Sequence, residues 1–376
     1  MLTTILEFFA LAGILVYILL ISLFFIGWIR QKPFIPKPSD TKPFTSIVIC
    51  CRNEESYLPI LLNCLKNQEY PVEKFEIILI DDHSTDTTLK IMQVFIETCK
   101  NARYYSLPAG IEGKKTGLRI AINLALGELI LTTDADCQMH SEWLSTIVSF
   151  RMQTNADLII SPVAYGTNSS LFQKIQALEF ASLIASGAAT ANLERPIMCN
   201  GANLAFMKSE YPSDTVALSS DSPSGDDIFL LQYLKKKNRY KIKFLKSPES
   251  LVYTVPSASL TEFINQRKRW FSKSSHYTDP DIIAVGLIVT FANFSLLLSL
   301  LLCITDAASW AFFLLLFAGK LVTDVIFLYP FLGFFNSKKL LWLAPFLEIL
   351  YPFYIFYIII SSRIGKYIWK ERKYGY

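Results

Sequence analysis

The chain has 376 residues, of which 52% are hydrophobic and 18% charged, and its net charge is only +4. This length suggests two or three structural units, and the composition is too apolar for an ordinary soluble protein. The basic residues cluster beside apolar segments, as membrane-flanking residues do, and no DNA- or RNA-binding pattern accompanies them. We therefore expect a protein that contacts the lipid bilayer and no nucleic acid.

The first segment, residues 1–30, is apolar enough and long enough to span a bilayer. Basic residues follow the apolar run instead of preceding it, and no small-residue cleavage site is visible. These features predict a retained transmembrane anchor, with its C-terminal end in the cytoplasm, and not a cleaved signal peptide. Residues 31–44 contain four prolines and are predicted to form a stiff linker.

Residues 45–259 have the pattern of an α/β domain, in which short apolar runs alternate with helical segments. The expected strands are 46–51, 75–80, 102–107 and 128–133, and the expected helices between and after them are 57–67, 87–99, 114–126 and 141–151. Such alternation predicts a mostly parallel sheet with right-handed crossovers. Ligands of open α/β sheets bind at the carboxyl ends of the strands.

The remainder of the chain is predicted to return to the membrane. Residues 260–279 indicate an amphipathic interfacial helix. Residues 280–362 hold three apolar segments, each long enough to span, before a basic tail at 363–376. We expect a multi-pass protein of the cell membrane with its α/β domain in the cytoplasm.

Three crossings after a cytoplasmic domain would put the basic tail outside, against the positive-inside tendency. Two alternatives remain open. Either one segment is re-entrant, for which the segment 340–361 with Pro345 and Pro352 is the best candidate, or the tail is an exception.

Paired carboxylates follow two of the predicted strands and begin a later helix. Asp82 follows the second strand, and Asp134 and Asp136 end the fourth, where their oxygens suit a divalent cation that ligand phosphates help to coordinate. Asp226 and Asp227 precede a helical run and could supply a general base. Each has a simpler explanation, since acids often cap helices or lie on solvated loops.

Taken together, the motifs resemble the membrane-bound branch of the family 2 inverting glycosyltransferases with the GT-A fold, a Rossmann-like nucleotide-diphospho-sugar transferase domain. The resemblance extends from about residue 45 to 271. It rests on several motifs in the family's order: Arg52-Asn53-Glu54, Asp81-Asp82-x-Ser84-x-Asp86, Gly113-Lys114, Asp134-Ala135-Asp136, Gly201-Ala202-Asn203, Gly225-Asp226-Asp227 and Gln266-x-x-Arg269-Trp270.

The resemblance implies a role for each matching residue on the donor side. Glu54 and Asp82 would contact the nucleoside of a nucleotide-sugar, and Lys114 would lie near it or its diphosphate. Asp134 would face the donor, and Asp136 would hold Mg²⁺ or Mn²⁺ on the diphosphate. UDP is the expected nucleotide, through the resemblance alone.

On the acceptor side, the resemblance makes Asp227 the base. Asp226 stands where the family often has Glu, so both acids remain candidates for taking the proton. Gln266, Arg269 and Trp270 would line the acceptor and diphosphate side. The simpler explanation for this segment is an interfacial helix with snorkelling basic residues.

The expected reaction is transfer of a sugar, with inversion, from a nucleotide-sugar to a membrane lipid or short glycan. A processive polysaccharide synthase is the alternative within the family, although four membrane segments are few for a polymer-conducting pore. A sugar-phosphate nucleotidyltransferase would want a glycine-rich loop after the first strand, and residues 50–55 contain no glycine. A transporter or channel with a nucleotide-sensing domain gains support from Lys320 and Asp324, which can pair within one membrane segment.

Overall fold

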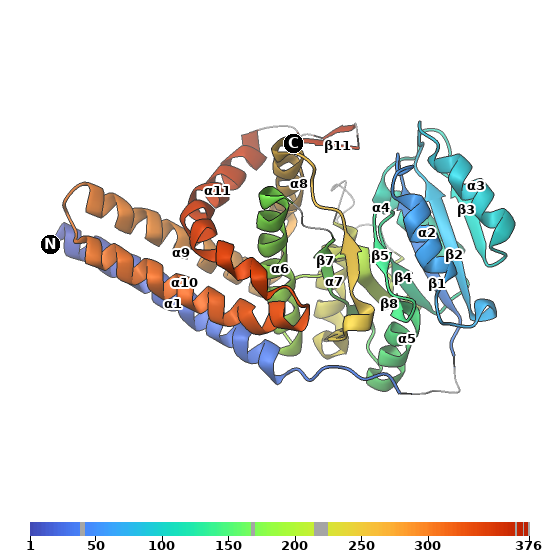
Figure 1. Cartoon of the computed structure of the whole chain (residues 1–376), viewed down its shortest axis with the longest axis horizontal. Helices are drawn as coiled ribbons and strands as arrows, with labels where there is room; N and C mark the ends of the chain where they lie inside the picture. The colour runs from blue at the N-terminus through green and yellow to red at the C-terminus, as the bar shows by residue number, and fades with distance from the viewer. Residues whose placement is uncertain (38–41, 167–169, 214–224, 365–366, 371, 375–376) are drawn as a thin grey trace.

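The computed structural model describes residues 1–37, 42–166, 170–213, 225–364, 367–370 and 372–374. Part of the expected linker, including Pro38, and residues 365–366, 371 and 375–376 of the expected basic tail lie outside these described residues. Long helices lie on one side of the molecule and an α/β domain on the other, with two further helices, α6 and α8, between them (Figure 1).

A seven-stranded sheet forms the centre of the α/β domain, in the order β3-β2-β1-β4-β8-β6-β9. The first four strands in this order are parallel, and β8 runs antiparallel to both of its neighbours. The strands are β1 Thr45–Cys51, β2 Phe75–Asp81, β3 Ala102–Ser106, β4 Leu129–Thr132, β6 Leu158–Ile160, β8 Leu204–Met207 and β9 Ile242–Phe244.

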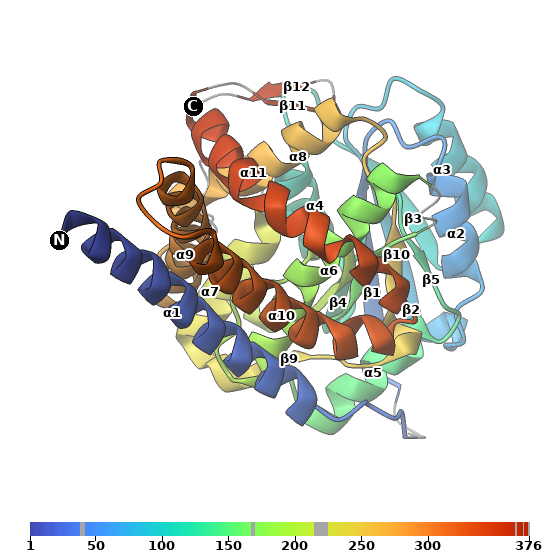
Figure 2. The ribbon, with the colours of Figure 1, turned by 60° about the vertical axis from the view of Figure 1, so that its left-hand side comes forward.

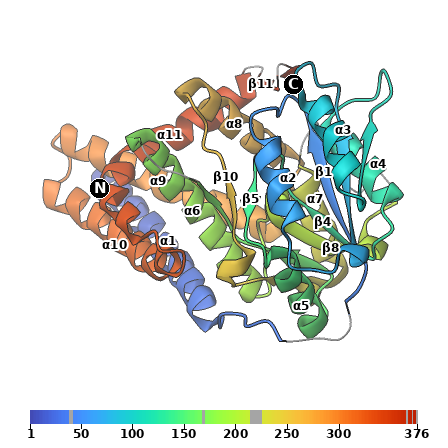
Figure 3. The ribbon, with the colours of Figure 1, turned by 45° about the vertical axis from the view of Figure 1, so that its right-hand side comes forward.

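Helices cover the sheet and bury its apolar strands, as Figure 3 shows for the helices beside β1 and β2. Every residue of β2 is buried, as expected for a parallel strand covered on both faces. The arrangement confirms the predicted α/β fold with a mostly parallel sheet. The helices of the domain are α2 Leu58–Lys66, α3 Thr88–Thr98, α4 Lys114–Leu124, α5 Trp143–Thr154, α6 Leu171–Asn192 and α7 Asp226–Asn238.

A smaller sheet and one helix extend the domain towards the long helices. The sheet has the order β5-β10-β7, formed by Gln138–Met139, Val252–Thr254 and Val163–Tyr165. Helix α8, Leu260–Ser272, follows β10 and is capped at its start by Ser259, whose side chain accepts from the Glu262 amide.

Within the described residues, four helices are long and apolar enough to cross a membrane: α1 Leu2–Arg30, α9 Pro280–Ile304, α10 Trp310–Phe334 and the 27-residue stretch Lys338–Ile364 that ends in α11, Ala344–Ile364. Helix α1 packs closely on two neighbours because glycines leave room for them. A Cβ at Gly27 would stand 2.5 Å from the Ala189 carbonyl oxygen of α6, and one at Gly13 would overlap Ser295 of α9.

A buried ion-pair network connects these helices. Lys320 of α10 lies 3.0 Å from Asp324 and 2.7 Å from Glu348 of α11, and the Tyr17 hydroxyl of α1 donates to Asp324 at 2.6 Å. The pair that supported the transporter alternative, Lys320 and Asp324, therefore lies in a contact among three helices. This position fits a structural ion pair.

The last described residues lie beside the α/β domain and not beyond the helical bundle. Helix α11 lies against α8, and the hairpin formed by β11, Tyr367–Trp369, and β12, Arg372–Tyr374, follows it (Figure 2). The Lys370 ammonium lies 2.6 Å from a carboxylate oxygen of Glu54, just after β1. The start of the α/β domain is thus joined to the C-terminal hairpin by a contact between residues 316 apart in sequence.

Candidate active site

One pocket lies where the carboxyl ends of β1, β2 and β4 meet. Parallel strands end at the same edge of a sheet, so the polar residues that follow them converge there. All of the predicted site residues line this pocket: Glu54, Asp82, Lys114, Asp134, Asp136, Asp226, Asp227, Gln266, Arg269 and Trp270.

Tight turns after β1 and β2 hold the first wall of the pocket. Asn53 and His83 both have left-handed backbone conformations, with φ of 52° and 55°. The Asn53 amide donates to the Ser84 hydroxyl at 3.2 Å, and its side-chain oxygen accepts from the Thr85 amide at 2.8 Å. These bonds fix the two turns to each other and so position Glu54 and Asp82, which flank them.

Asp86, at the end of the same motif, has a structural role. One of its oxygens accepts from the Thr88 amide at 2.9 Å at the start of α3, and the other accepts from the Glu55 amide at 3.1 Å. It thereby ties the start of α3 to the turn after β1.

Lys114 stands at the start of α4 and forms an ion pair with Asp134. Burial lowers the pKa of Lys114, but the carboxylates of Asp134 and Asp226 outweigh it and raise the pKa above its ordinary value. The ammonium therefore stays protonated at neutral pH and is available to neutralise an anionic ligand.

Asp136 lies beyond Asp134 and accepts from the Thr254 hydroxyl at 3.1 Å. Burial, and next the charge of Asp134, raise the pKa of Asp136. The described part of the chain contains no group of three His, Cys, Asp or Glu side chains placed to hold a metal ion. Two carboxylates fit Mg²⁺ or Mn²⁺ when a ligand's phosphates complete the shell, because such ions commonly keep only one or two protein ligands.

Asp226 and Asp227 open helix α7 but have different surroundings. Asp227 accepts from the Ile228 amide at 2.8 Å and from the Gly201 amide at 3.2 Å, and Lys273 lies 3.8 Å away. Burial raises the pKa of Asp227, but Lys273 and these amides outweigh it, so the pKa lies below its ordinary value. Burial instead dominates at Asp226 and raises its pKa. The surroundings therefore favour the ionised form of Asp227 more than that of Asp226.

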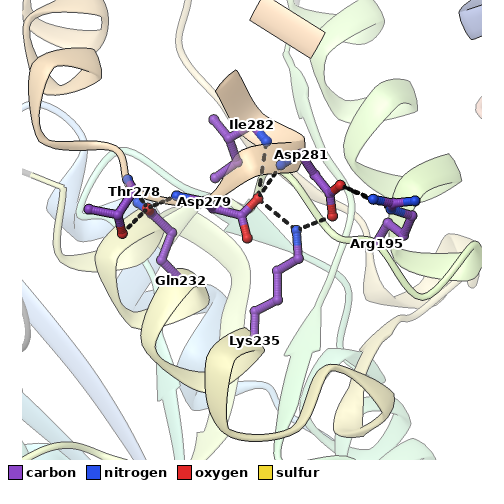
Figure 4. Close-up of polar contacts among 7 residues, drawn as sticks. All are labelled: Arg195, Gln232, Lys235, Thr278, Asp279, Asp281 and Ile282. Carbon is purple, nitrogen blue, oxygen red and sulfur yellow. Dashed lines mark hydrogen bonds and ion pairs between the residues drawn. The ribbon is translucent and has the colours of Figure 1, made fainter. Parts of the chain in front are cut away.

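The C-terminal half of α7 is bound to the N-terminal end of α9 (Figure 4). Lys235 donates to Asp279 and to Asp281, both at 2.8 Å, and Arg195 also pairs with Asp281. Gln232 accepts from the Asp279 amide at 3.2 Å. Helix α7 therefore joins the paired acids to the first long apolar helix after the domain.

Helix α8 forms the opposite wall through Gln266, Arg269 and Trp270. Between them, Arg267 is buried and forms a two-pronged ion pair with Glu179 of α6. The Arg267 guanidinium also lies 4.2 Å from the Trp270 ring centroid. This pair fixes α8 against α6 and so orients the pocket-lining side chains on either side of it.

Four residues that line the pocket were not predicted as site residues from the sequence. Lys273 has a detectable signal, since it lies four residues after Arg269 and so on the same helical face. Arg52 stands within a quoted motif without an assigned role. Lys370 and Arg372 carry no local signal, because their basic neighbours indicated a membrane-surface tail. All four line the pocket.

The fold is that of the glycosyltransferases of the GT-A type. The family described as "Glycosyl transferase family group 2" matches residues 129–359, more than half of the chain, and "Glycosyl transferase family 2" matches residues 46–210. The chain belongs to the family 2 glycosyltransferases and is an enzyme.

Curated relatives are glycosyltransferases that match only part of the chain. Glycosyltransferase AglE of Haloferax volcanii is 31% identical over 125 residues, which are 32% of this chain and 40% of the relative. The beta-monoglucosyldiacylglycerol synthase of a Nostoc species is 32% identical over 120 residues, 32% of this chain and 26% of the relative. The matched part thus spans less than half the length of either relative.

Among solved structures, the mannosyltransferase PcManGT from Pyrobaculum calidifontis, in complex with GDP-Man and Mn²⁺, resembles this chain with a TM-score of 0.58. The likeness covers 92% of this chain and 99% of that chain at 18% identity. At this identity the likeness establishes the fold, and it extends over the long helices as well as the α/β domain.

Proposed function

We propose that the protein transfers a sugar from a nucleotide-sugar to a membrane lipid or short glycan, with inversion, at the cytoplasmic face of the cell membrane. The observation that carries the proposal is that three sets of residues line one pocket. They are the carboxylates at the strand ends, the paired acids of α7, and Gln266, Arg269 and Trp270 of α8. That pocket lies between the sheet and the long apolar helices.

In the proposed reaction, Asp227 accepts the proton of an acceptor hydroxyl as that oxygen attacks the anomeric carbon. The bond from this carbon to the diphosphate breaks on the opposite face, and its electron pair leaves with the nucleoside diphosphate. Lys114 and Arg269 supply positive charge to the departing group. When bound, Mg²⁺ or Mn²⁺ would stabilise the same developing charge as a Lewis acid, held by Asp136 with Asp134 beside it.

Support for a nucleotide-sugar comes from the chemistry of the pocket. Glu54 and Asp82 offer oxygens that accept hydrogen bonds from a nucleoside, and Lys114 offers charge to its phosphates. The structural neighbour is described in complex with GDP-Man and Mn²⁺. A GDP-sugar is therefore a second candidate donor, in addition to the UDP-sugar that we expect. Among the predicted partners, the donor is the most strongly supported.

Support for a lipid acceptor comes from the position of α8. Trp270 lines the pocket, and α8 packs along α11. The relative from Nostoc is named beta-monoglucosyldiacylglycerol synthase. A lipid hydroxyl at the bilayer surface could reach the pocket along this side, and the product would be a glycolipid.

The experiment uses membranes containing the full-length chain, a panel of radiolabelled UDP- and GDP-sugars, and Mn²⁺ or Mg²⁺. We expect one donor to label material that extracts into organic solvent. Label in a water-soluble polymer would point to the polysaccharide synthase. No transfer from any donor, in membranes where the protein is folded, would contradict the proposed function.

A further inference from the structure

The C-terminal hairpin places two cations on the carboxylates at the donor end of the pocket. Arg372 donates to both oxygens of Asp82, at 2.7 and 3.0 Å, and lies 3.1 Å from Glu112. Lys370 lies 2.6 Å from Glu54. Both acids therefore have a charged partner from a segment about 300 residues away.

The backbone of the hairpin is bound at the same place. Arg52 donates from Nε to the Lys370 carbonyl at 3.2 Å, and from Nη1 to the carbonyls of Asp82 and His83 at 2.8 and 2.9 Å. One guanidinium thus joins the turn after β2 to the hairpin. The contact is built from backbone and side-chain bonds together, which a loosely lying surface tail would lack.

Charge balance in the pocket depends on these two residues. Among the described residues that line it, six are acidic and six are basic. The acids are Glu54, Asp82, Asp134, Asp136, Asp226 and Asp227, and the bases are Arg52, Lys114, Arg269, Lys273, Lys370 and Arg372. Without the hairpin, six acids would face four bases in a pocket that has to hold an anionic diphosphate.

A buried carboxylate without a partner is also costly, because its charge has left water. Asp82 has only 4% of its side chain exposed, and Arg372 covers it with 14% of its own exposed. Lys370 is more accessible, with 32% exposed, and Glu54 has 11%. The hairpin therefore neutralises two acids in a low-dielectric part of the pocket. Without it, their negative charges would repel a phosphate ligand strongly.

We propose that Lys370 and Arg372 are donor-binding residues, which neutralise Glu54 and Asp82 and so allow the pocket to bind a nucleoside diphosphate. This inference rests on the proposed function, since it takes the pocket as the nucleotide-sugar site. It extends that function by making the C-terminal hairpin part of the site.

The test measures binding of UDP and of GDP, each with Mn²⁺, to the purified full-length protein in lipid nanodiscs. For the nucleotide that the wild type binds, we expect Lys370→Ala combined with Arg372→Ala to raise Kd at least about tenfold, a change of about 1.4 kcal/mol. Arg372→Lys keeps the charge and should therefore raise Kd by a smaller factor. Arg363→Ala removes an exposed basic residue at the end of α11, outside the pocket, and should leave Kd unchanged.

Lys370→Ala alone is a second variant, chosen because its side chain is the more exposed of the two and its loss threatens folding least. Its effect should shrink as salt concentration rises, because screening weakens charge interactions but not a purely structural defect. Unchanged Kd in the folded variants would overturn the inference. Tighter binding would also overturn it, since the hairpin would then be a competitor of the nucleotide. If the wild type binds neither nucleotide, the proposed function itself fails.

Discussion

At the scale of single residues, Asp226 and Asp227 show how neighbours separate two adjacent acids. The Gly201 and Ile228 amides and the Lys273 ammonium all approach Asp227, whereas burial is the dominant influence on Asp226. The sequence left open which acid takes the proton. The surroundings favour Asp227, because a general base has to be ionised before it can accept a proton.

Asp227→Asn should therefore reduce kcat by roughly 100-fold or more, the usual contribution of a positioned base, with little change in donor binding. Steady-state kinetics with the donor identified by the panel would measure this. Asp226→Asn should cost less in kcat than Asp227→Asn. Transfer near the wild-type rate by a folded Asp227→Asn protein would remove Asp227 from the proposed mechanism.

Glu54 gives a prediction about pH. Burial raises the pKa of Glu54 from an ordinary value of 4.5 to about 7, against the opposing effect of Lys370. Between these values the folded state binds a proton that the unfolded state has released. Stability from this group is therefore lost as pH rises from about 4.5 through 7.

Glu54→Gln removes that titration and keeps the size of the side chain. Relative to wild type, we expect the variant's Tm to increase between pH 5 and pH 8, because only the wild type has to ionise a buried group. Thermal unfolding of both proteins in the same nanodiscs provides the comparison. A Tm difference that stays constant over this range, or changes in the other direction, would contradict the raised pKa.

At the scale of elements, helix α7 connects the paired acids to the membrane side of the molecule. Its last turns are fixed by Lys235, which pairs with Asp279 and Asp281 at the start of α9. The Lys235 side chain is 7% exposed, and the side chains of Asp279 and Asp281 are 11% and 15% exposed.

Lys235→Ala should destabilise the protein by roughly 3 kcal/mol, the scale for removing one partner from a buried ion pair. Thermal unfolding measures the loss. Lys236→Ala is the matched control, because Lys236 is the exposed next residue on the same helix and should have almost no effect. Equal Tm values for the two variants would mean that the α7–α9 contact contributes little.

At the scale of the whole molecule, the position of the hairpin bears on membrane topology. Lys370 and Arg372 contact the α/β domain, so we propose that this hairpin lies on the same side of the bilayer as that domain. In this arrangement α9 and α10 would cross the bilayer and return, and the stretch Lys338–Ile364 would enter without crossing. This is the re-entrant alternative left open by the sequence, and it satisfies the positive-inside tendency.

A cleavable tag added after Tyr376 tests this topology. In sealed inside-out vesicles, added protease should remove the tag, whereas a cleavage site inserted at Asp306, between α9 and α10, should be protected. Protection of the C-terminal tag together with cleavage at Asp306 would place the tail outside and exclude the contact between hairpin and pocket in the membrane.

The α/β fold could be predicted from local patterns, and the pocket residues were grouped through the resemblance to the family. Parallel strands end at one edge, so acids directly after β1, β2 and β4 had to meet there. The roles of Arg267 and Arg372 could not be predicted in this way. Arg267 has its partner Glu179 on a helix 88 residues away, and Arg372 meets Asp82 only through the packing of α11 on α8.

The central claim is that one displacement, assisted by Asp227, inverts the sugar as it passes from a nucleotide-sugar to the acceptor. The most direct measurement is the anomeric configuration of the product, determined by NMR spectroscopy after reaction of the purified full-length protein in vesicles. We predict a configuration opposite to that of the donor, and formation of this product by Asp227→Asn at a rate lower by roughly 100-fold or more. A product that retains the donor's configuration would contradict the account.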